Sequence, residues 1–314
     1  MPTAATTARC CAAACCAALA VAGCAGPGGG GAAADGDVEV VASSYVLGWL
    51  VGEVGGERVA VQALGSPGAD SHAVELTPQQ VGRLAEVDLV VHQDALSPAA
   101  DEAVATHGGD HVLEVSDGAE LLASPGRAGD GEAGGEDGDG GAGVRDPHFW
   151  LDPTRLAAVA GAVADRLGEV DPAGAASYAE GAHRVEEELA ALDAAYEDGL
   201  AACRGRTLVT SHEAFGYLAE RYGLVQVGIA GLDPEVEPPP SRLRDVVEVV
   251  EGRDVRTVFF EVSTGPGLTR ALAGDLGLRT GVLDPVERRP DGGGDYLSTM
   301  RDNLAALQQG LGCA

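Results

Sequence analysis

Positive charge is scarce in this sequence, and all of it comes from arginine. The 314 residues contain no lysine, and 20 arginines stand against 49 aspartates and glutamates, which gives a formal net charge of -29 at pH 7. A surface with this charge repels a phosphate backbone, whereas proteins that bind DNA or RNA draw much of their affinity from lysine and arginine. The charge balance therefore argues against a nucleic acid as partner.

Long hydrophobic runs are missing after the N-terminus. No later segment approaches the roughly 18 to 20 apolar residues that a membrane-spanning helix needs. The N-terminus itself has one positive charge at Arg9, then a short apolar run and small residues, which is the pattern of an export signal. We expect residues 1–23 to be removed and the segment 24–36, rich in Gly and Ala, to be a flexible tether.

The end of this export signal resembles a bacterial lipobox. In the stretch Val21-Ala22-Gly23-Cys24, lipidation would make Cys24 the first residue of the mature protein and anchor it on the outer face of the cytoplasmic membrane. The alternative is an ordinary signal peptide with a chance cysteine, because four further cysteines stand between positions 10 and 16.

Cysteine is rare in the part of the chain that is expected to fold. Beyond Cys24 only Cys203 and Cys313 remain, and neither has the neighbours expected of a catalytic thiol. Outside the cytoplasm two such thiols are more often paired than free. We predict a structural disulfide between them.

Short β-branched runs alternate with helical patterns twice along the chain. This alternation predicts parallel sheets with helices on both faces, and thus an α/β protein with two lobes of four strands each. The strand candidates are 38–44, 58–64, 88–92 and 111–115 in the first half and 207–211, 224–229, 256–260 and 279–283 in the second. Helical patterns in the first half lie at 46–55, 78–86 and 97–106.

One continuous amphipathic pattern separates the two halves. Its apolar residues recur at spacings of three and four, which predicts a rigid helix that traverses both lobes. These residues are Tyr178, Ala182, Val185, Leu189, Leu192, Tyr196 and Leu200. The expected domains are a first lobe over 37–170, this helix over 171–203 and a second lobe over 204–314.

Polar side chains that can bind a metal follow several of the expected strands. His72 and His148 belong to the first half, and His212 and Asp284 directly follow strands of the second half. Ligands of open parallel sheets bind beyond the carboxyl ends of the strands, so these side chains could converge between the lobes. The other histidines, at 92, 107, 111 and 183, have weaker positions and are expected to be structural or exposed.

Four ordered stretches resemble one known family. They are PGADSHAVELTPQQ, DPHFWLDP, SHEAFGYLAERYGL, and LDPV with the later DYLSTMRDNLAAL, and they extend from about Val38 to Leu311. Together they are similar to the solute-binding proteins of zinc and manganese ABC transporters, the family that includes ZnuA. The resemblance implies two pseudo-symmetric α/β lobes joined by one long helix, a monomer, and partners that are a membrane permease and, through it, an ATPase.

The resemblance also implies a metal site made by His72, His148, His212 and Asp284. Three imidazoles and one carboxylate fill the tetrahedron that Zn²⁺ prefers, with no ligand position left for a catalytic water. Manganese-type members of the family carry Glu where His212 stands, so the sequence favours Zn²⁺ over Mn²⁺ as the transported ligand. Glu261 matches a family glutamate near the site and is expected to hold a ligand rather than to bind the metal itself.

The run before His148 departs from the family pattern. Zinc-binding members often carry a histidine-rich loop at this position, whereas residues 125–143 contain no histidine and five acids. These carboxylates could bind divalent ions weakly, or the segment is a disordered insertion without a role.

Other classes of function stay open at this stage. A metallohydrolase could also use three histidines and an aspartate, but the chain has no HExxH or GxSxG pattern, and we expect no enzymatic activity. A surface adhesin is a further alternative, because some relatives were first described as adhesins. The leading hypothesis is capture of zinc outside the cytoplasm for a membrane transporter.

Overall fold

The computed structural model describes residues 37–65, 71–122, 145–261, 267–290 and 292–313. All of its helices and strands belong to one unit, Ala33–Ala314. The expected signal peptide, Cys24 and the acidic segment 125–143 lie outside the described residues. Within these ranges no helix combines the length and the apolar composition that crossing a membrane requires.

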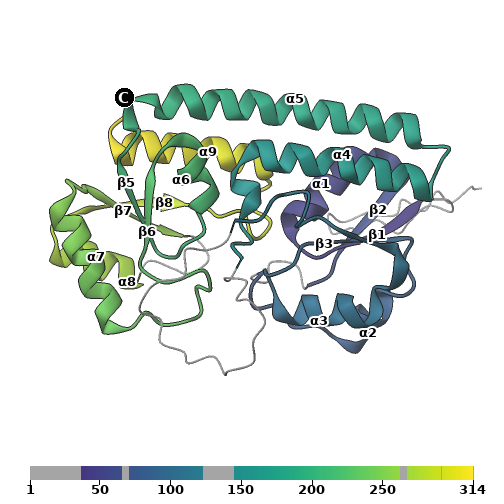
Figure 1. The fold of residues 1–314 in the computed structure, drawn as a ribbon, viewed down its shortest axis with the longest axis horizontal. Coiled ribbons are helices and arrows are strands. Elements are labelled where there is room, and N and C mark those ends of the chain that lie inside the picture. The colour runs from purple at the N-terminus through teal and green to yellow at the C-terminus, as the bar shows by residue number, and fades with distance from the viewer. Residues whose placement is uncertain (1–36, 66–70, 123–144, 262–266, 291, 314) are drawn as a thin grey trace, which may run out of the picture. The chain divides into compact units, whose positions relative to one another are not determined.

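The first lobe is built on a four-stranded parallel sheet (Figure 1). Its order is β2-β1-β3-β4, so the first strand lies inside the sheet and the chain crosses over between neighbours. Val40 and Val41 of β1 are 0 % and 2 % exposed, because helices cover both faces of the sheet. The strands are β1 (Val38–Ala42), β2 (Val59–Ala63), β3 (Leu89–His92) and β4 (Val112–Glu114).

The second lobe repeats this topology. Its parallel sheet has the order β6-β5-β7-β8, which is the same pattern of crossovers. The strands are β5 (Thr207–Thr210), β6 (Val225–Gly228), β7 (Thr257–Glu261) and β8 (Arg279–Leu283). The two four-stranded parallel sheets predicted from the alternating pattern are confirmed, and every expected strand lies within two residues of an observed one.

Helices cover each sheet on both sides. In the first lobe they are α1 (Tyr45–Gly55), α2 (Pro78–Arg83), α3 (Pro98–His107) and α4 (Pro153–Val170). In the second lobe they are α6 (Gly216–Tyr222), α7 (Pro240–Gly252), α8 (Gly267–Asp275) and α9 (Tyr296–Leu311). Short 3-10 helices lie at Gly56–Arg58, Gly109–His111, Phe149–Leu151 and Ala201–Cys203.

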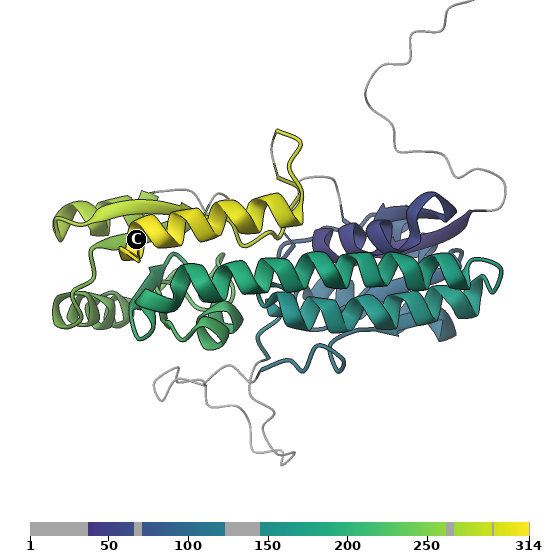
Figure 2. The ribbon, with the colours of Figure 1, turned by 90° about the horizontal axis from the view of Figure 1, so that it is seen from above.

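Helix α5 (Ala175–Leu200) connects the lobes and packs on both of them. It contacts α1 and α4 of the first lobe and α9 of the second, and it runs alongside them in Figure 2. All seven apolar positions that predicted this helix are buried. The helix begins four residues later than expected, because α4 ends at Val170 and the residues Asp171–Gly174 form a turn.

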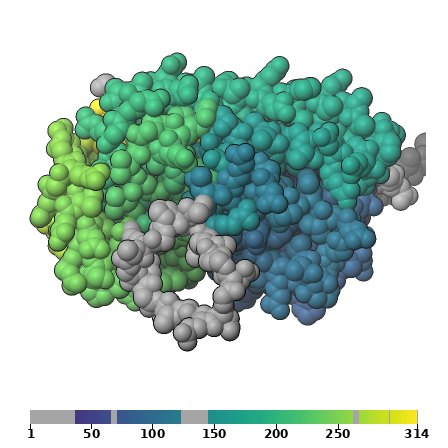
Figure 3. Space-filling model, viewed as in Figure 1, coloured from purple at the N-terminus to yellow at the C-terminus, as the bar shows by residue number. Residues whose placement is uncertain are grey.

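One hydrophobic core extends through both lobes. It includes Leu47 of α1, Leu192 of α5 and Leu307 of α9, each at most 2 % exposed. The lobes also contact each other directly, since the hydroxyl of Tyr217 in α6 donates to the carbonyl of Asp146 at 2.7 Å and accepts from the Leu122 N–H at 2.7 Å. Figure 3, in the same view as Figure 1, shows the first lobe in blue in contact with the second lobe in green.

A disulfide joins the two ends of the second lobe. Cys203, just before β5, is bonded to Cys313, which follows α9, with a Cα–Cα distance of 5.3 Å. This is the pairing expected from the two cysteines beyond Cys24. The bond ties the end of α9 to the end of α5.

Reducing this disulfide should lower the stability of the protein. A bridge that closes a loop of 110 residues stabilises by up to about 4 to 5 kcal/mol in the chain-entropy model. Chemical denaturation of oxidised and reduced protein measures the difference, with alkylation and mass spectrometry to count free thiols. Two thiols that react in the unreduced, folded protein would contradict the bridge.

Candidate metal site

Four side chains from both lobes converge on one point. His72, His148, His212 and Glu287 each offer a ligand atom, and these atoms all lie within 4.8 Å of one another. His148 and His212 are fully buried, Glu287 is 3 % exposed and His72 is half-buried. The two lobes therefore contribute two side chains each to a nearly closed site.

The ends of the secondary-structure elements place these side chains. His72 lies beyond β2, and His148 directly precedes the 3-10 helix Phe149–Leu151 at the entry to α4. His212 follows β5, and Glu287 follows β8. Side chains beyond the carboxyl ends of parallel strands share one edge of each sheet, which is why residues so distant in sequence meet.

The distances fit a tetrahedral metal ion. One carboxylate oxygen of Glu287, Oε1, lies 3.4 Å from His72 Nε2, 3.2 Å from His148 Nε2 and 3.4 Å from His212 Nε2. The Nε2 atoms of His72 and His148 are 3.1 Å apart. Ligands about 2.1 Å from a central Zn²⁺ stand about 3.4 Å from each other in a tetrahedron.

Two further carboxylates orient the histidines. Asp146 Oδ1 lies 2.8 Å from Nδ1 of His148 and accepts from its backbone N–H at 3.0 Å. Glu261 at the end of β7 contacts Nδ1 of His212 through Oε2 and accepts from its backbone N–H through Oε1 at 3.2 Å. A carboxylate on Nδ1 fixes the ring and leaves Nε2 free to bind a metal. The expected place of Glu261 beside a ligand agrees with this geometry, whereas sequence analysis missed Asp146.

Burial and charge act against each other at this site. Burial lowers the pKa of His212, but the negative charges of Glu261 and Glu287 and the hydrogen bond to Glu261 outweigh it and raise the pKa to about 10. Burial also lowers the pKa of His148, but the hydrogen bond to Asp146 and the negative charges of Asp146 and Glu287 outweigh it, so this pKa is raised as well. Burial raises the pKa of Glu287, but the contacts with His148, His212 and His72 outweigh it and hold this pKa well below its usual range. The carboxylates around the site thus favour positive charge on His148 and His212.

Some buried polar atoms of the site have no hydrogen bond. Nε2 of His212 and both carboxylate oxygens of Glu287 are buried without a hydrogen-bond partner. Such groups cost free energy unless a partner satisfies them. Nε2 of His212 and Oε1 of Glu287 lie 3.4 Å apart within the cluster, so a cation bound between them would satisfy both.

The expected fourth ligand, Asp284, is not in the cluster, and Glu287 takes its place. The Asp284 carboxylate accepts a hydrogen bond from the backbone N–H of Val286 at 2.8 Å. Its backbone is fixed by Asn303, whose side chain accepts from the Asp284 N–H at 2.9 Å and donates to its carbonyl at 2.7 Å. The short side chain of Asp284 thus shapes the turn that presents Glu287.

The remaining histidines lie elsewhere in the described structure. Nε2 of His92 lies 3.3 Å from Asp101, and Nε2 of His111 lies 2.7 Å from the backbone carbonyl of Leu84, just after α2. His183 is exposed on α5 beside Glu186, and His107 is exposed at the end of α3. None of the four is in the metal cluster found among the described residues.

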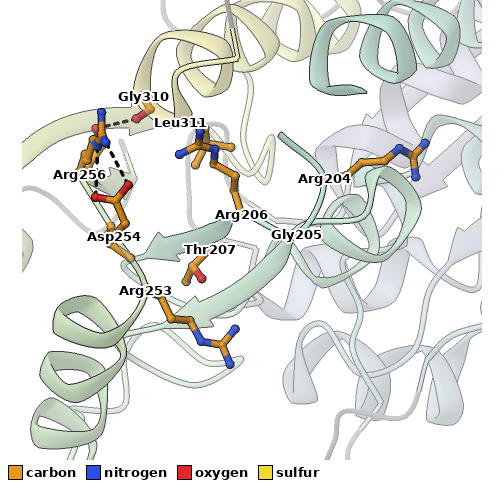
Figure 4. Close-up of a pocket in the computed structure, with 11 residues that line it drawn as sticks. Arg204, Gly205, Arg206, Thr207, Arg253, Asp254, Arg256, Gly310 and Leu311 are labelled. Carbon is orange, nitrogen blue, oxygen red and sulfur yellow. Dashed lines mark hydrogen bonds and ion pairs between the residues drawn. The ribbon is translucent and has the colours of Figure 1, made fainter. Parts of the chain in front are cut away.

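A separate hollow of about 430 Å³ lies at the opposite edge of the second sheet, where β5 and β7 begin. Arginines 204, 206, 253 and 256 line it, and Arg256 is paired with Asp254 at 3.0 Å. In Figure 4 the labelled arginine side chains do not point to one centre. The hollow contains no residue of the metal cluster and has no convergent ligand set.

Comparison with known families gives a clear match for this arrangement. Residues 40–310 match the family described as zinc-uptake complex component A, periplasmic. The chain belongs to this family. Its two pseudo-symmetric lobes and long connecting helix are the architecture that the resemblance implied.

Individual members of the zinc-uptake component A family are similar over most of the chain. The zinc-binding lipoprotein AdcA of Streptococcus pneumoniae is 31% identical over 287 residues, which cover 88% of this chain but 56% of AdcA. The chain thus spans about half the length of that relative. The high-affinity zinc uptake system protein ZnuA of Bacillus subtilis is 26% identical, with 87% of this chain and 88% of ZnuA covered.

A solved structure of a relative has the same fold. The Zn(II)-bound form of a variant of AdcAII from Streptococcus pneumoniae superposes with a TM-score of 0.77 and 29% sequence identity. The match covers 88% of this chain and 100% of AdcAII.

The raised pKa of His212 predicts a pH dependence for the metal-free protein. A group whose pKa is higher in the folded state contributes stability that is present below about pH 6.5 and is lost as pH rises toward the folded value. We therefore expect the free energy of unfolding, measured in a chelator, to fall between about pH 6.5 and 9 by up to about 1.4 kcal/mol per pH unit for each proton lost.

The matched control is His212→Gln, which removes the titrating group. The decrease in the free energy of unfolding with rising pH should be smaller in this variant than in the unaltered protein. His183→Gln replaces an exposed histidine, and this variant should show the same pH dependence as the unaltered protein. Equal pH dependence in all three proteins would show that His212 carries no raised pKa.

Proposed function

We propose that this protein captures Zn²⁺ outside the cytoplasm and delivers it to the membrane permease of an ABC transporter. The observation that carries the proposal is the tetrahedral spacing of three imidazole Nε2 atoms and one carboxylate oxygen between the two lobes. His72, His148, His212 and Glu287 would be the ligands, and the metal is the cargo. Membership of the zinc-uptake family supports the same assignment.

The donor set favours zinc over manganese. Three imidazoles and one carboxylate suit Zn²⁺, whereas Mn²⁺ prefers sites richer in oxygen. The relatives named above are described as zinc-binding or zinc-uptake proteins, and AdcAII binds Zn(II) in its solved structure.

The coordination also favours binding over catalysis. A catalytic zinc site typically has three protein ligands and one position for the water that it activates. In this protein the four ligand atoms, which lie within 4.8 Å of one another, would fill all four positions, and the site is nearly closed to solvent. The geometry suits a protein that takes up and releases an ion. We propose that it does so as a monomer, with the ATPase of the transporter acting through the permease.

Zinc binding should depend on Glu287 and not on Asp284. Glu287→Gln keeps the size of the side chain but replaces the charged carboxylate with a neutral amide, which is a weaker metal ligand. The zinc affinity should therefore fall on the order of 100-fold or more. Asp284→Asn is the matched control, because an amide oxygen can still accept from Val286 N–H, and its affinity should change by no more than a few-fold. Competition with a chromophoric zinc chelator measures both values.

The opposite ranking would restore Asp284 as the ligand and overturn the assignment of Glu287. The free energy of unfolding, measured with and without zinc, provides a second test. Zinc at about 1,000 times Kd adds about 4 kcal/mol to it. A protein that shows no such gain with zinc and binds none in the competition assay would refute the function itself.

We further propose that Cys24 is lipidated and anchors the protein to the outer face of the cytoplasmic membrane. The lipobox-like stretch that ends at Cys24 and the segment 24–36 support this localisation, and the relative AdcA is described as a lipoprotein. Cys24→Ser should release the protein into the medium or leave an uncleaved precursor. Unchanged lipid labelling and membrane retention of this variant would exclude the anchor.

A further inference from the structure

The turn that carries Glu287 has an unusual backbone. Val286 has a φ of 61°, in the left-handed region, and its side chain is fully buried. A β-branched residue is rarely found there, because its side chain clashes with the backbone, and the conformation costs free energy that neighbouring contacts must offset. Neighbouring contacts must therefore hold Val286 in a backbone conformation that valine disfavours.

Two donors from the first lobe bind the carbonyls on either side of Val286. The indole Nε1 of Trp150 donates to the carbonyl of Pro285 at 2.7 Å, and the hydroxyl of Ser71 donates to the carbonyl of Glu287. Both donors lie close to metal ligands in sequence, since Ser71 precedes His72 and Trp150 stands two residues after His148.

Trp150 is itself fixed from the second lobe. It is completely buried, its backbone carbonyl accepts from the hydroxyl of Tyr296 at 2.6 Å, and its ring centre lies 5.4 Å from that of His148. A single side chain thus contacts one ligand ring and holds the turn that carries another ligand.

We propose that Trp150, with Ser71, is a positioning residue that clamps the strained turn at Val286 so that Glu287 faces the three histidines. This inference rests on the proposed zinc site. It adds the contacts by which the first lobe holds the turn of the second lobe that carries Glu287. When the clamp is closed, the cost of the Val286 conformation is offset and the site is complete. When the clamp is lost, Val286 returns to an ordinary φ and the Glu287 carboxylate turns away from the histidines.

The test compares two substitutions of the same chemistry. Trp150→Phe keeps an aromatic ring but removes the N–H that holds Pro285. Trp49→Phe is the matched control, because Trp49 also lies at the junction, stacked on Tyr296 with ring centres 4.8 Å apart, yet its buried Nε1 has no hydrogen-bond partner. We expect Trp150→Phe to weaken zinc binding about tenfold, since only a fraction of the molecules retains the competent turn. Trp49→Phe should bind zinc like the unaltered protein.

A rescue experiment separates positioning from general damage to the core. Glycine adopts a positive φ without a steric cost, so Val286→Gly should make the turn independent of the clamp. In this background Trp150→Phe should reduce zinc affinity by less than about twofold. Val286→Ala removes nearly the same packing but keeps the strain, and in that background the loss should stay near about tenfold.

The results that overturn the clamp differ from those that overturn the zinc site. If the unaltered protein binds zinc and Trp150→Phe binds it as tightly as Trp49→Phe, the clamp does not exist. If Trp150→Phe weakens binding equally in the Val286→Gly and Val286→Ala backgrounds, Trp150 acts only through the core. Failure of the unaltered protein to bind zinc would instead refute the function on which the clamp rests.

Discussion

The buried carboxylate of Glu287 imposes the main constraint on how the two lobes are arranged. A buried negative charge is strongly unfavourable unless partners surround it, and its partners are three imidazoles, two of which come from the other lobe. The lobes must therefore be held within hydrogen-bonding distance of each other. The shared core and helix α5, which packs on both lobes, provide that fixed geometry.

Because the lobes pack tightly on each other, we expect the site to open in its local turns. Helix α5 packs on both lobes, and hydrogen bonds such as those of Tyr217 and Trp150 connect them directly. A hinge between the lobes would have to break all of these contacts. Movement of a short segment after one strand breaks only a few, so the turn at Val286 is the easier place for the site to open.

The sequence predicted the frame well because the frame depends on local patterns. Alternating β-branched runs located the strands, and spacings of three and four located α5, since burial on two faces and on one stripe leave distinct periodicities. The family resemblance and the positions near strand ends singled out His72, His148 and His212, and the structure brings these three side chains together. The cysteine pair followed from the number of thiols and their compartment.

The fourth ligand could not be predicted in this way. Asp284 and Glu287 are both acids that follow β8, and strand position alone favours the nearer one. The choice is made by the φ of Val286, which turns the chain toward the histidines and which no property of valine suggests. That conformation depends on Trp150 and Ser71, which are distant in sequence. The sequence did contain one indication, because Glu287 is a second acid three residues beyond Asp284.

The charges of the site suit a cation at the centre of the cluster. The carboxylates of Asp146, Glu261 and Glu287 raise the pKa of both His148 and His212, that of His212 to about 10. Binding of Zn²⁺ requires these imidazoles to be neutral. A cation bound between these rings would replace the positive charge of any proton that leaves them. The carboxylates that orient the histidines therefore favour positive charge at the centre of the cluster, whether protons or a metal ion carry it.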